Sequence, residues 1–254
     1  MIETPHELPD RANVLGCPID RLDMTKTLAR CEQLIADRGF AQHVAINAAK
    51  LVAMRKNTRL ATIVRACELI SADGQSIVWA SRLLGDPLPE RVAGIDLMYE
   101  LLALAERRGY RVYILGARPE VLEQAVERIK AKHPRIPLAG HRHGYFTEDE
   151  GASVAAQIQA ARPEMLFVAI SSPLKEYWLA RHGRETGVPF VMGVGGSVDV
   201  IAGLTSRAPG LMQRAGLEWL YRLAQEPRRL VRRYVVTNAR FLLMLVRELM
   251  TRRR

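Results

Sequence analysis

Cysteine is scarce in this sequence: the chain of 254 residues has only Cys17, Cys31 and Cys67. Their number is odd and no two of them form a C-x-x-C pair, which argues against both a disulfide framework and a zinc site. We therefore expect them to be small residues in a reduced protein.

Long apolar runs are missing too. The longest run in the last fifty residues covers only 241–246, far below the roughly 20 residues that a membrane-spanning helix needs. The N-terminus has neither a basic start nor an apolar stretch, so it does not resemble a signal peptide. We expect a protein that stays in the cytoplasm and does not cross a bilayer.

Several catalytic signatures are absent as well. The sequence has no complete G-x-G-x-x-G near a first strand, and no G-x-S-x-G nucleophile elbow. His141 and His143 lie close together, but no carboxylate or cysteine stands at a ligand spacing from them. We expect no metal ion, no other cofactor and no covalent catalysis.

Charge is divided unevenly along the chain. Residues 205–254 hold twelve arginines and three acidic residues, whereas residues 1–204 hold 25 basic and 24 acidic side chains. The sequence thus predicts a nearly neutral domain over 1–204 and a basic appendage over 205–254. Such an end, with aromatic and aliphatic residues among its arginines, indicates contact with an anionic surface or a polyphosphate.

Short apolar runs alternate with longer segments of helical period through residues 1–204. This alternation predicts an α/β fold with a Rossmann-like, doubly wound, mainly parallel sheet, whose ligands bind beyond the carboxyl ends of the strands. We expect strands at 43–47, 68–72, 111–115, 136–139, 165–170 and 189–194. We expect helices at 48–55, 58–67, 75–84, 94–108, 120–133, 148–161 and 174–186.

Asp73 and Gly74 stand between one of these strands and the helix after it. This position places the carboxylate where ligands bind, and Gly74 lets the backbone turn closely beside a ligand. Asp73 is therefore a candidate general base. The alternative, which the spacing alone favours, is that Asp73 caps the helix that follows it.

Two further strand ends carry glycines. Gly116 lies in a tight turn before a helix whose N-terminal amides suit a phosphate or a ribose, and residues 193–197 read Gly-Val-Gly-Gly-Ser. We interpret both as candidate nucleotide-binding loops, with plain tight turns as the alternative.

The appendage predicts two helices separated at Pro227. Arg222, Arg229 and Arg232 share one helical side if the kink at Pro227 is mild, and planar guanidinium groups suit a diphosphate. The alternative is a basic face that is solvated or lies on anionic lipid headgroups.

Together these motifs resemble the WecG/TagA/CpsF family of bacterial glycosyltransferases (glycosyltransferase family 26), over roughly residues 43 to 240. The resemblance rests on blocks that stand in the family's order and spacing. They are Asn47-Ala48-Ala49-Lys50, Asp73-Gly74-Gln75, Glu90-Arg91-Val92-Ala93-Gly94-Ile95-Asp96, Leu115-Gly116-Ala117, Gly144-Tyr145-Phe146, Ser172-Pro173-Leu174-Lys175-Glu176, Gly195-Gly196-Ser197-Val198-Asp199, Arg207-Ala208-Pro209, Leu217-Glu218-Trp219 and Glu226-Pro227-Arg228-Arg229.

The resemblance implies an inverting, metal-independent transfer of an N-acetylhexosamine such as N-acetylmannosamine, or of a hexose or uronic acid. The donor is then a UDP-sugar, and the acceptor is a sugar on a polyprenyl diphosphate, in the synthesis of a surface polysaccharide. It also implies a peripheral protein at the inner face of the cell membrane, whose appendage docks on the anionic membrane surface. A homo-oligomer that buries the apolar part of the appendage is a competing use for it.

The resemblance also assigns roles to residues. Asp73 aligns with the family's proposed catalytic carboxylate, and Arg222, Arg229 and Arg232 are expected to neutralise the UDP diphosphate. The expected substrate-binding residues are Asn47, Gly74, Arg91, Gly94, Gly116, Lys175, Glu176, Gly196 and Asp199.

Two positions depart from the family's pattern. Ala45 stands where the family often has a threonine, so no hydroxyl from that position can assist. Lys175 stands where many members have a glutamine; it either binds a sugar carboxylate or a phosphate, or pairs with Glu176. Both departures leave the donor sugar open, with N-acetylmannosamine as the family's default.

Two other classes of function compete with this one. A Rossmann-type NAD-dependent dehydrogenase explains the α/β body, and a basic nucleic-acid-binding protein explains the appendage. The first lacks its G-x-G-x-x-G, and the second does not call for motifs at six strand ends. We therefore expect a glycosyltransferase without a nucleic-acid partner.

Overall fold

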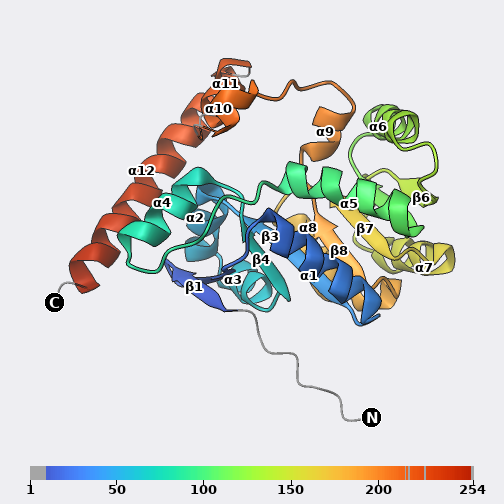
Figure 1. The fold of residues 1–254 in the computed structure, drawn as a ribbon, viewed down its shortest axis with the longest axis horizontal. Helices are drawn as coiled ribbons and strands as arrows, with labels where there is room; N and C mark the ends of the chain where they lie inside the picture. The colour runs from blue at the N-terminus through green and yellow to red at the C-terminus, as the bar shows by residue number, and fades with distance from the viewer. Residues whose placement is uncertain (1–9, 215, 217, 226, 253–254) are drawn as a thin grey trace, which may run out of the picture.

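The computed structural model describes residues 10–252 except 215, 217 and 226. Its centre is a sheet of six parallel strands in the order β4-β3-β8-β7-β5-β6 (Figure 1). These strands are β3 (Ala41–Ile46), β4 (Leu69–Ala72), β5 (Val112–Gly116), β6 (Leu138–Arg142), β7 (Met165–Ala169) and β8 (Phe190–Gly193). All six were expected from the sequence, so the prediction of an α/β fold with a parallel sheet is confirmed.

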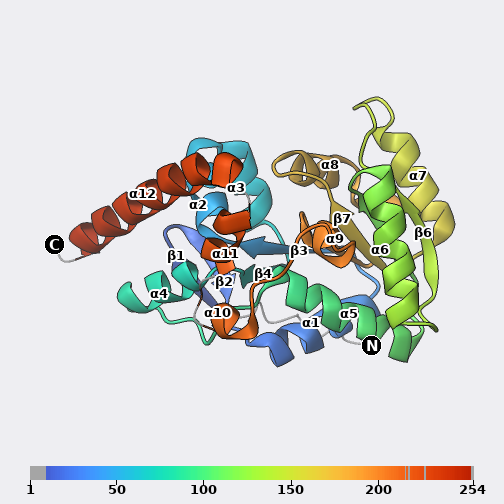
Figure 2. The ribbon, with the colours of Figure 1, turned by 90° about the horizontal axis from the view of Figure 1, so that it is seen from above.

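Helices cover both faces of this sheet (Figure 2). The side chains of Met165 and Phe167 in β7 pack on one face with α1 (Met24–Ala36), α5 (Gly94–Arg108), α6 (Pro119–Lys132) and α9 (Ser197–Ile201). Leu166 and Val168 pack on the other face with α7 (Gly151–Ala161) and α8 (Leu174–His182), which a short 3-10 turn (Arg184–Thr186) follows. Successive residues of a strand point to opposite faces, which is why a strand covered on both sides is apolar throughout.

A hairpin that the sequence did not predict extends the fold beyond β4. Its strands are β1 (Arg11–Val14) and β2 (Cys17–Asp20), and α1, also unpredicted, follows them. Asp20 Oδ2 accepts a hydrogen bond of 2.6 Å from the backbone N–H of Ile70 in β4, and Asp20 Oδ1 pairs with Arg11 Nε at 2.7 Å. A buried side chain thus satisfies an amide on the edge strand, where an unpaired amide would otherwise invite another chain.

A third apolar cluster lies between the hairpin and the C-terminal part of the chain. It includes α2 (Ala48–Lys56), α3 (Thr58–Arg65) and α4 (Gln75–Leu83), together with Phe241 and Leu245 of the long helix α12 (Pro227–Arg252). The short helices α10 (Gly210–Arg214) and α11 (Glu218–Gln225) precede α12. Two appendage helices separated at Pro227 are therefore confirmed. Within the described residues, no helix is both long enough and apolar enough to span a membrane.

The three cysteines are buried and form no disulfide. Burial raises the pKa of both Cys17 and Cys67 to about 12, so neither thiol ionises near neutral pH. All three are small residues of the apolar core.

We predict that Asp20→Ala lowers the free energy of unfolding by about 3 kcal/mol, because it leaves the buried Ile70 amide and the Arg11 guanidinium without their partner. The matched control is Asp10→Ala, because the Asp10 side chain is 80% exposed and pairs with Arg21 at the surface. Urea unfolding of both variants measures the difference. Equal losses in the two variants would show that the hairpin does not depend on Asp20.

Candidate functional site

The carboxylate of Asp73 lies at the carboxyl end of β4 and is partly exposed. Asp73 Oδ1 accepts a hydrogen bond of 2.9 Å from the backbone N–H of Gly94, the first residue of α5. The helix that directly follows Asp73, α4, has Gly74 as its N-cap and no side-chain cap. The alternative that Asp73 caps its own helix is therefore wrong: it holds the N-terminus of a helix from another part of the chain, and this contact fixes its position.

Asn47 and Gly74 lie side by side next to Asp73. Asn47 caps α2, with its Oδ1 accepting a hydrogen bond of 3.0 Å from the N–H of Lys50. A Cβ added to Gly74 would lie 3.6 Å from Asn47 Cβ, an ordinary contact, and the φ of Gly74 is −118°. Gly74 therefore adopts a backbone conformation open to any residue, contrary to the expected need for glycine in this turn.

A buried cluster of charges lies beside these residues. Lys50 Nζ pairs with Glu176 Oε1 at 2.6 Å, and Lys175 Nζ lies 3.5 Å from the same oxygen. The side chains of the two lysines are each 10% exposed, and that of Glu176 is 1% exposed. A Cβ at Gly193, the last residue of β8, would lie 2.6 Å from Lys175 Cε, so the lysine chain lies against the strand end. The pairing of Lys175 with Glu176 is thus observed, while its binding of a phosphate or a sugar carboxylate stays a prediction.

The charges in this cluster shift one another's pKa values. Burial lowers the pKa of Lys175 to about 8 and Lys50 acts in the same direction, although Glu176 and Asp73 oppose the shift. Burial opposes ionisation of Glu176, but the two lysines hold its pKa below the usual range. The cluster contains two ammonium groups and one carboxylate, with the negative charge of Asp73 near Lys175. The three buried groups together therefore favour an anion beside them, and Asp73 supplies one.

Sequence reasoning missed Lys50 and His43. His43 Nε2 lies 2.9 Å from Ser71 Oγ, and burial together with the charge of Lys50 lowers the pKa of His43 to about 3. The imidazole is therefore neutral. Lys50 could have been predicted from the sequence, because it stands three residues after Asn47 in a block that carries the resemblance.

Gly116 and Gly196 lie at other strand ends. The φ of Gly116 is +127°, and an added Cβ would lie 2.4 Å from the carbonyl carbon of Ala169 in β7. Glycine at 116 is therefore required by the packing of β5 on β7. A Cβ at Gly196, the N-cap of α9, would lie 3.5 Å from Asp199 Oδ2, which places these two predicted site residues in contact range.

Two ion pairs fasten the appendage to the body next to Asp73. Arg91 pairs with Glu218 Oε2 of α11 at 3.1 Å, and Arg207 makes two hydrogen bonds, of 2.6 and 3.1 Å, to the carboxylate of Asp96. Although partial burial opposes it, Asp96 and Glu218 raise the pKa of Arg207 above its ordinary value. Arg91, Glu218, Arg207 and Asp96 thus form a row in which positive and negative side chains alternate. Arg91, expected to bind substrate, joins the appendage to the body in this structure.

The appendage also touches the helix that follows Asp73. A Cβ added to Gly216, just before α11, would lie 2.7 Å from both Cβ and Cγ of Gln75. Gln75 is the first residue of α4 and stands two residues after Asp73. The start of α11 therefore lies next to the carboxyl end of β4.

Comparison with known proteins agrees with this arrangement. A model of the Glycosyl transferase WecG/TagA/CpsF family matches residues 12–254. The chain belongs to this family. Similar proteins include an N-acetylglucosaminyldiphosphoundecaprenol N-acetyl-beta-D-mannosaminyltransferase of Bacillus spizizenii, 36% identical over 68% of this chain and 67% of that protein. A Staphylococcus aureus protein of the same name is 32% identical over 87% of each chain.

Membership of the WecG/TagA/CpsF family decides between the three classes of function in favour of the glycosyltransferase. The match reaches through the appendage to residue 254, so the family pattern includes the helices that dock beside Asp73. In the part of the chain that the structure describes, no three His, Cys, Asp or Glu side chains gather where they would hold a metal ion.

The predicted site residues fall into groups. The structure brings together Asn47, Asp73, Gly74, Gly94, Lys175 and Glu176 at the ends of β3, β4 and β8. Gly116 lies at the end of β5, Gly196 and Asp199 follow β8, and Arg91 meets the appendage. The side chains of Arg222, Arg229 and Arg232 lie outside what the structure describes, so their expected contact with a diphosphate stays a prediction.

We predict that Gly116→Ala lowers the free energy of unfolding by about 3 kcal/mol or more, since it combines a strained φ with a clash against β7. The matched variant Gly74→Ala is expected to cost less than about 1 kcal/mol, because its φ is negative and its Cβ has room. Thermal or urea unfolding compares the two. A similar cost at both positions would contradict the different constraints on these glycines.

We predict a pH-dependent contribution of Lys175 to stability. A lysine whose pKa falls from about 10.4 in the unfolded chain to about 8 in the fold stabilises the fold above both values, and this stability is lost as pH falls through 8. Relative to Lys175→Gln, the wild type should gain about 3 kcal/mol between pH 7 and pH 10.5. Urea unfolding across this range tests it; parallel pH profiles would mean that Lys175 is not shifted.

Proposed function

We propose that this protein transfers N-acetylmannosamine from UDP-N-acetylmannosamine to the N-acetylglucosamine of N-acetylglucosaminyl-diphosphoundecaprenol. The names of the Bacillus and Staphylococcus relatives support the sugar and the acceptor. The observation that carries the proposal is the position of Asp73: a partly exposed carboxylate, anchored to α5, beside a buried cluster with an excess of ammonium groups.

In the proposed reaction, Asp73 takes the proton of the acceptor hydroxyl. The acceptor oxygen then forms a bond to the anomeric carbon of the donor sugar on the face opposite the diphosphate. The bond from that carbon to the UDP oxygen breaks at the same time, and UDP leaves with the electron pair, so the configuration inverts. The hydrogen bond from Gly94 keeps Asp73 in place for this step, as a general base requires.

The departing diphosphate needs positive charge as its negative charge grows. Lys175 is suited to this task, because its ammonium is buried at the end of β8 and destabilised there until an anion approaches. Arg222, Arg229 and Arg232 belong to α11 and α12, whose beginning is held beside Asp73 by the Arg91 and Arg207 ion pairs. We propose that they close over the diphosphate when donor and acceptor are bound.

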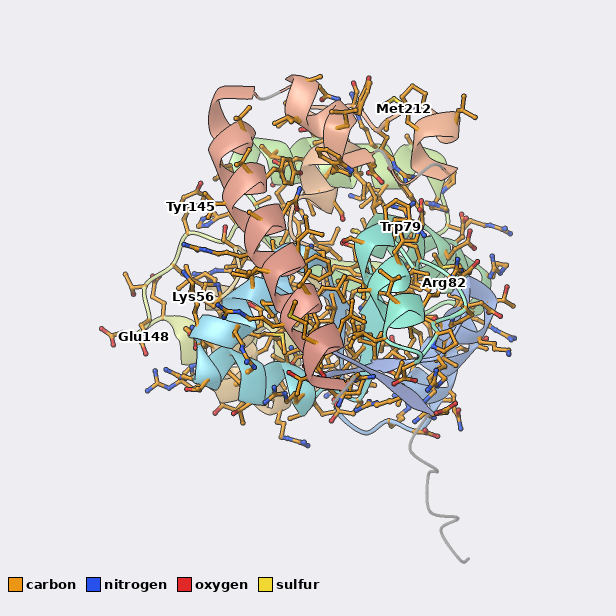
Figure 3. The ribbon with its side chains drawn as sticks, turned by 90° about the vertical axis from the view of Figure 1, so that its left-hand side faces the viewer. Lys56, Trp79, Arg82, Tyr145, Glu148 and Met212 are labelled. Carbon is orange, nitrogen blue, oxygen red and sulfur yellow. The ribbon has the colours of Figure 1, made fainter. Side chains whose placement is uncertain are left out.

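The docking of α12 on an anionic membrane is part of the proposal. We call its exposed apolar side chains the outer face of α12. These residues are Val231, Val235, Val236, Leu242, Leu243, Val246 and Met250. Figure 3 views the molecule from the side where α12 crosses in front, with Trp79 and Arg82 of α4 beside it. Trp79 is 51% exposed, and a helix with such a face and flanking arginines is typical of one lying at a membrane surface.

We predict that Asp73→Asn lowers kcat by about 100- to 10,000-fold, because the amide still accepts from Gly94 but cannot take a proton. Transfer of N-acetylmannosamine to a short-chain diphosphate-linked N-acetylglucosamine, with the product identified by mass spectrometry, measures it. Asp23→Asn is the matched control, since Asp23 caps α1. UDP binding should persist in both variants. If Asp73→Asn turns over at nearly the wild-type rate, Asp73 serves only to cap α5.

We predict that Leu242→Gln weakens binding to phosphatidylglycerol vesicles by about tenfold, because an apolar side chain loses its burial in the membrane. Leu204→Gln is the control: Leu204 is 53% exposed against 58% for Leu242, but it precedes the appendage helices. Vesicle flotation measures both. If the two variants bind as the wild type does, the outer face of α12 has another use, such as burial in an oligomer.

A further inference from the structure

A cavity of about 210 Å³ lies away from the strand ends, between the β1–β2 turn, α2, α3 and α12. Its apolar lining consists of Leu15, Leu51, Met54, Ala61 and Met244. This volume is below the roughly 300 to 1,000 Å³ of pockets that enclose drug-sized ligands. The cavity is therefore too small for a UDP-sugar, and none of its lining residues belongs to the site around Asp73.

Arginine and threonine side chains complete the lining of the cavity. Arg55 and Arg65 supply guanidinium groups, and Thr58 and Thr62 supply hydroxyls. Arg65 also donates from Nε to the carbonyl of Gly16, at 2.9 Å, which fixes that arginine at the rim. The Thr62 hydroxyl already donates to the backbone carbonyl of Thr58, at 3.1 Å. Guanidinium groups and the Thr58 hydroxyl above an apolar floor are suited to an anion that carries apolar groups.

The surroundings of the cavity are basic on both sides. From Ala48 to Arg65 the sequence contains five basic residues and no acid, and Lys56 lies next to Arg55. On α12, Arg240 and Arg247 stand four residues before and three residues after Met244, so they share its side of the helix. Of the carboxylates that the structure describes, none lies within 4 Å of the charged groups of Arg55, Lys56, Arg65, Arg240 or Arg247.

The cavity lies close to the face that we propose to lie on the membrane, because Arg247 stands three residues after Met244 and four after Leu243 and so lies on α12 between the cavity and the outer face. Met250, also of the outer face, stands three residues after Arg247 and shares its side of α12. Figure 3 shows Lys56 on one side of α12 and Arg82 on the other, on the same side of the molecule. A ligand seated in the cavity can thus extend apolar chains along α12 toward the bilayer.

We propose that this cavity binds the phosphodiester headgroup of an anionic membrane phospholipid, with the acyl chains along the outer face of α12. The proposal rests on the docking of α12 on a membrane, and adds a defined lipid site to it. Charge complementarity and continuity with the apolar face select a lipid over a free anion. Such a site would fix the rotation of α12 at the surface and hence the direction in which the Asp73 site faces the acceptor.

The test compares Arg55→Gln with Arg82→Gln in the full chain. Both arginines are exposed, both stand in the last turn of a nine-residue helix, and only Arg55 lines the cavity. Flotation with phosphatidylcholine vesicles, with and without a fixed fraction of phosphatidylglycerol, gives their affinities. Arg82→Gln should lose about fivefold, the effect of one cation near a surface, and Arg55→Gln at least about tenfold more. Equal losses would overturn the proposal in favour of a diffuse basic surface.

A second measurement separates a lipid from a free anion. Dihexanoyl-phosphatidylglycerol below its micelle concentration should bind the wild type saturably, as measured by calorimetry, and bind Arg55→Gln at least about tenfold more weakly. Inorganic phosphate should bind far more weakly than the short-chain lipid. Equal affinity for the two ligands would overturn the lipid assignment. Neither binding experiment contains the donor or the acceptor of the transfer reaction. A failure to bind lipid therefore does not contradict the proposed transfer reaction. If the transfer reaction fails, these binding measurements still test the lipid site.

Discussion

The structure depends on the alternating charges of Arg91, Glu218, Arg207 and Asp96. Arg91 precedes α5 and Asp96 lies in its first turn, whereas Glu218 and Arg207 belong to the appendage, so the pairs join parts of the chain separated by 127 and 111 positions. Arg91 and Glu218 are mostly buried, and Arg207 holds Asp96 with a bidentate contact. Loss of one member leaves a partly desolvated charge without its partner, which costs far more than a surface pair contributes.

This junction decides where the positive charge of the appendage goes. The twelve arginines of residues 205–254 repel one another, and the three acids of the segment can neutralise only part of their charge. By fixing Glu218 and Arg207 next to Gln75 and Asp73, the body sets the direction in which α11 and α12 start. Beyond that point the buried contacts of Phe241 and Leu245 direct α12 along α2, which leaves its outer face in solvent. One segment thus serves the strand-end site with its first part and, in our proposal, the membrane with its last.

Much of the fold could be predicted from the sequence. Strands covered on both faces are apolar throughout, and the helices between them show the helical period of apolar residues. The hairpin was missed for physical reasons: its strands have four residues each, contain Arg11, Pro18 and Asp20, and are held by β4 rather than by their own pattern. The turn between them has φ values of +54° at Leu15 and +82° at Gly16, and leucine does not signal such a turn.

The site was predictable to a lesser extent. Asp73 was identified by its place after a strand, but its hydrogen bond to Gly94, across 21 residues of sequence, was not. Glycines with different roles look alike in a sequence. Gly116 makes room for β7 and Gly193 makes room for Lys175, whereas the space around Gly74 does not require a glycine. Arg91 was expected to bind substrate from the resemblance, and the sequence did not reveal its ion pair with Glu218.

The most direct measurement is a charge-exchange cycle between Asp96 and Arg207, scored by the rate of sugar transfer. If the ion pairs place the appendage over the site, Asp96→Arg and Arg207→Asp each lose at least about tenfold, and the double exchange recovers most of the rate with a coupling of about 2 kcal/mol. The account is contradicted if the folded single variants transfer sugar at the wild-type rate. It is also contradicted if the loss of rate in the double variant equals the product of the two single losses.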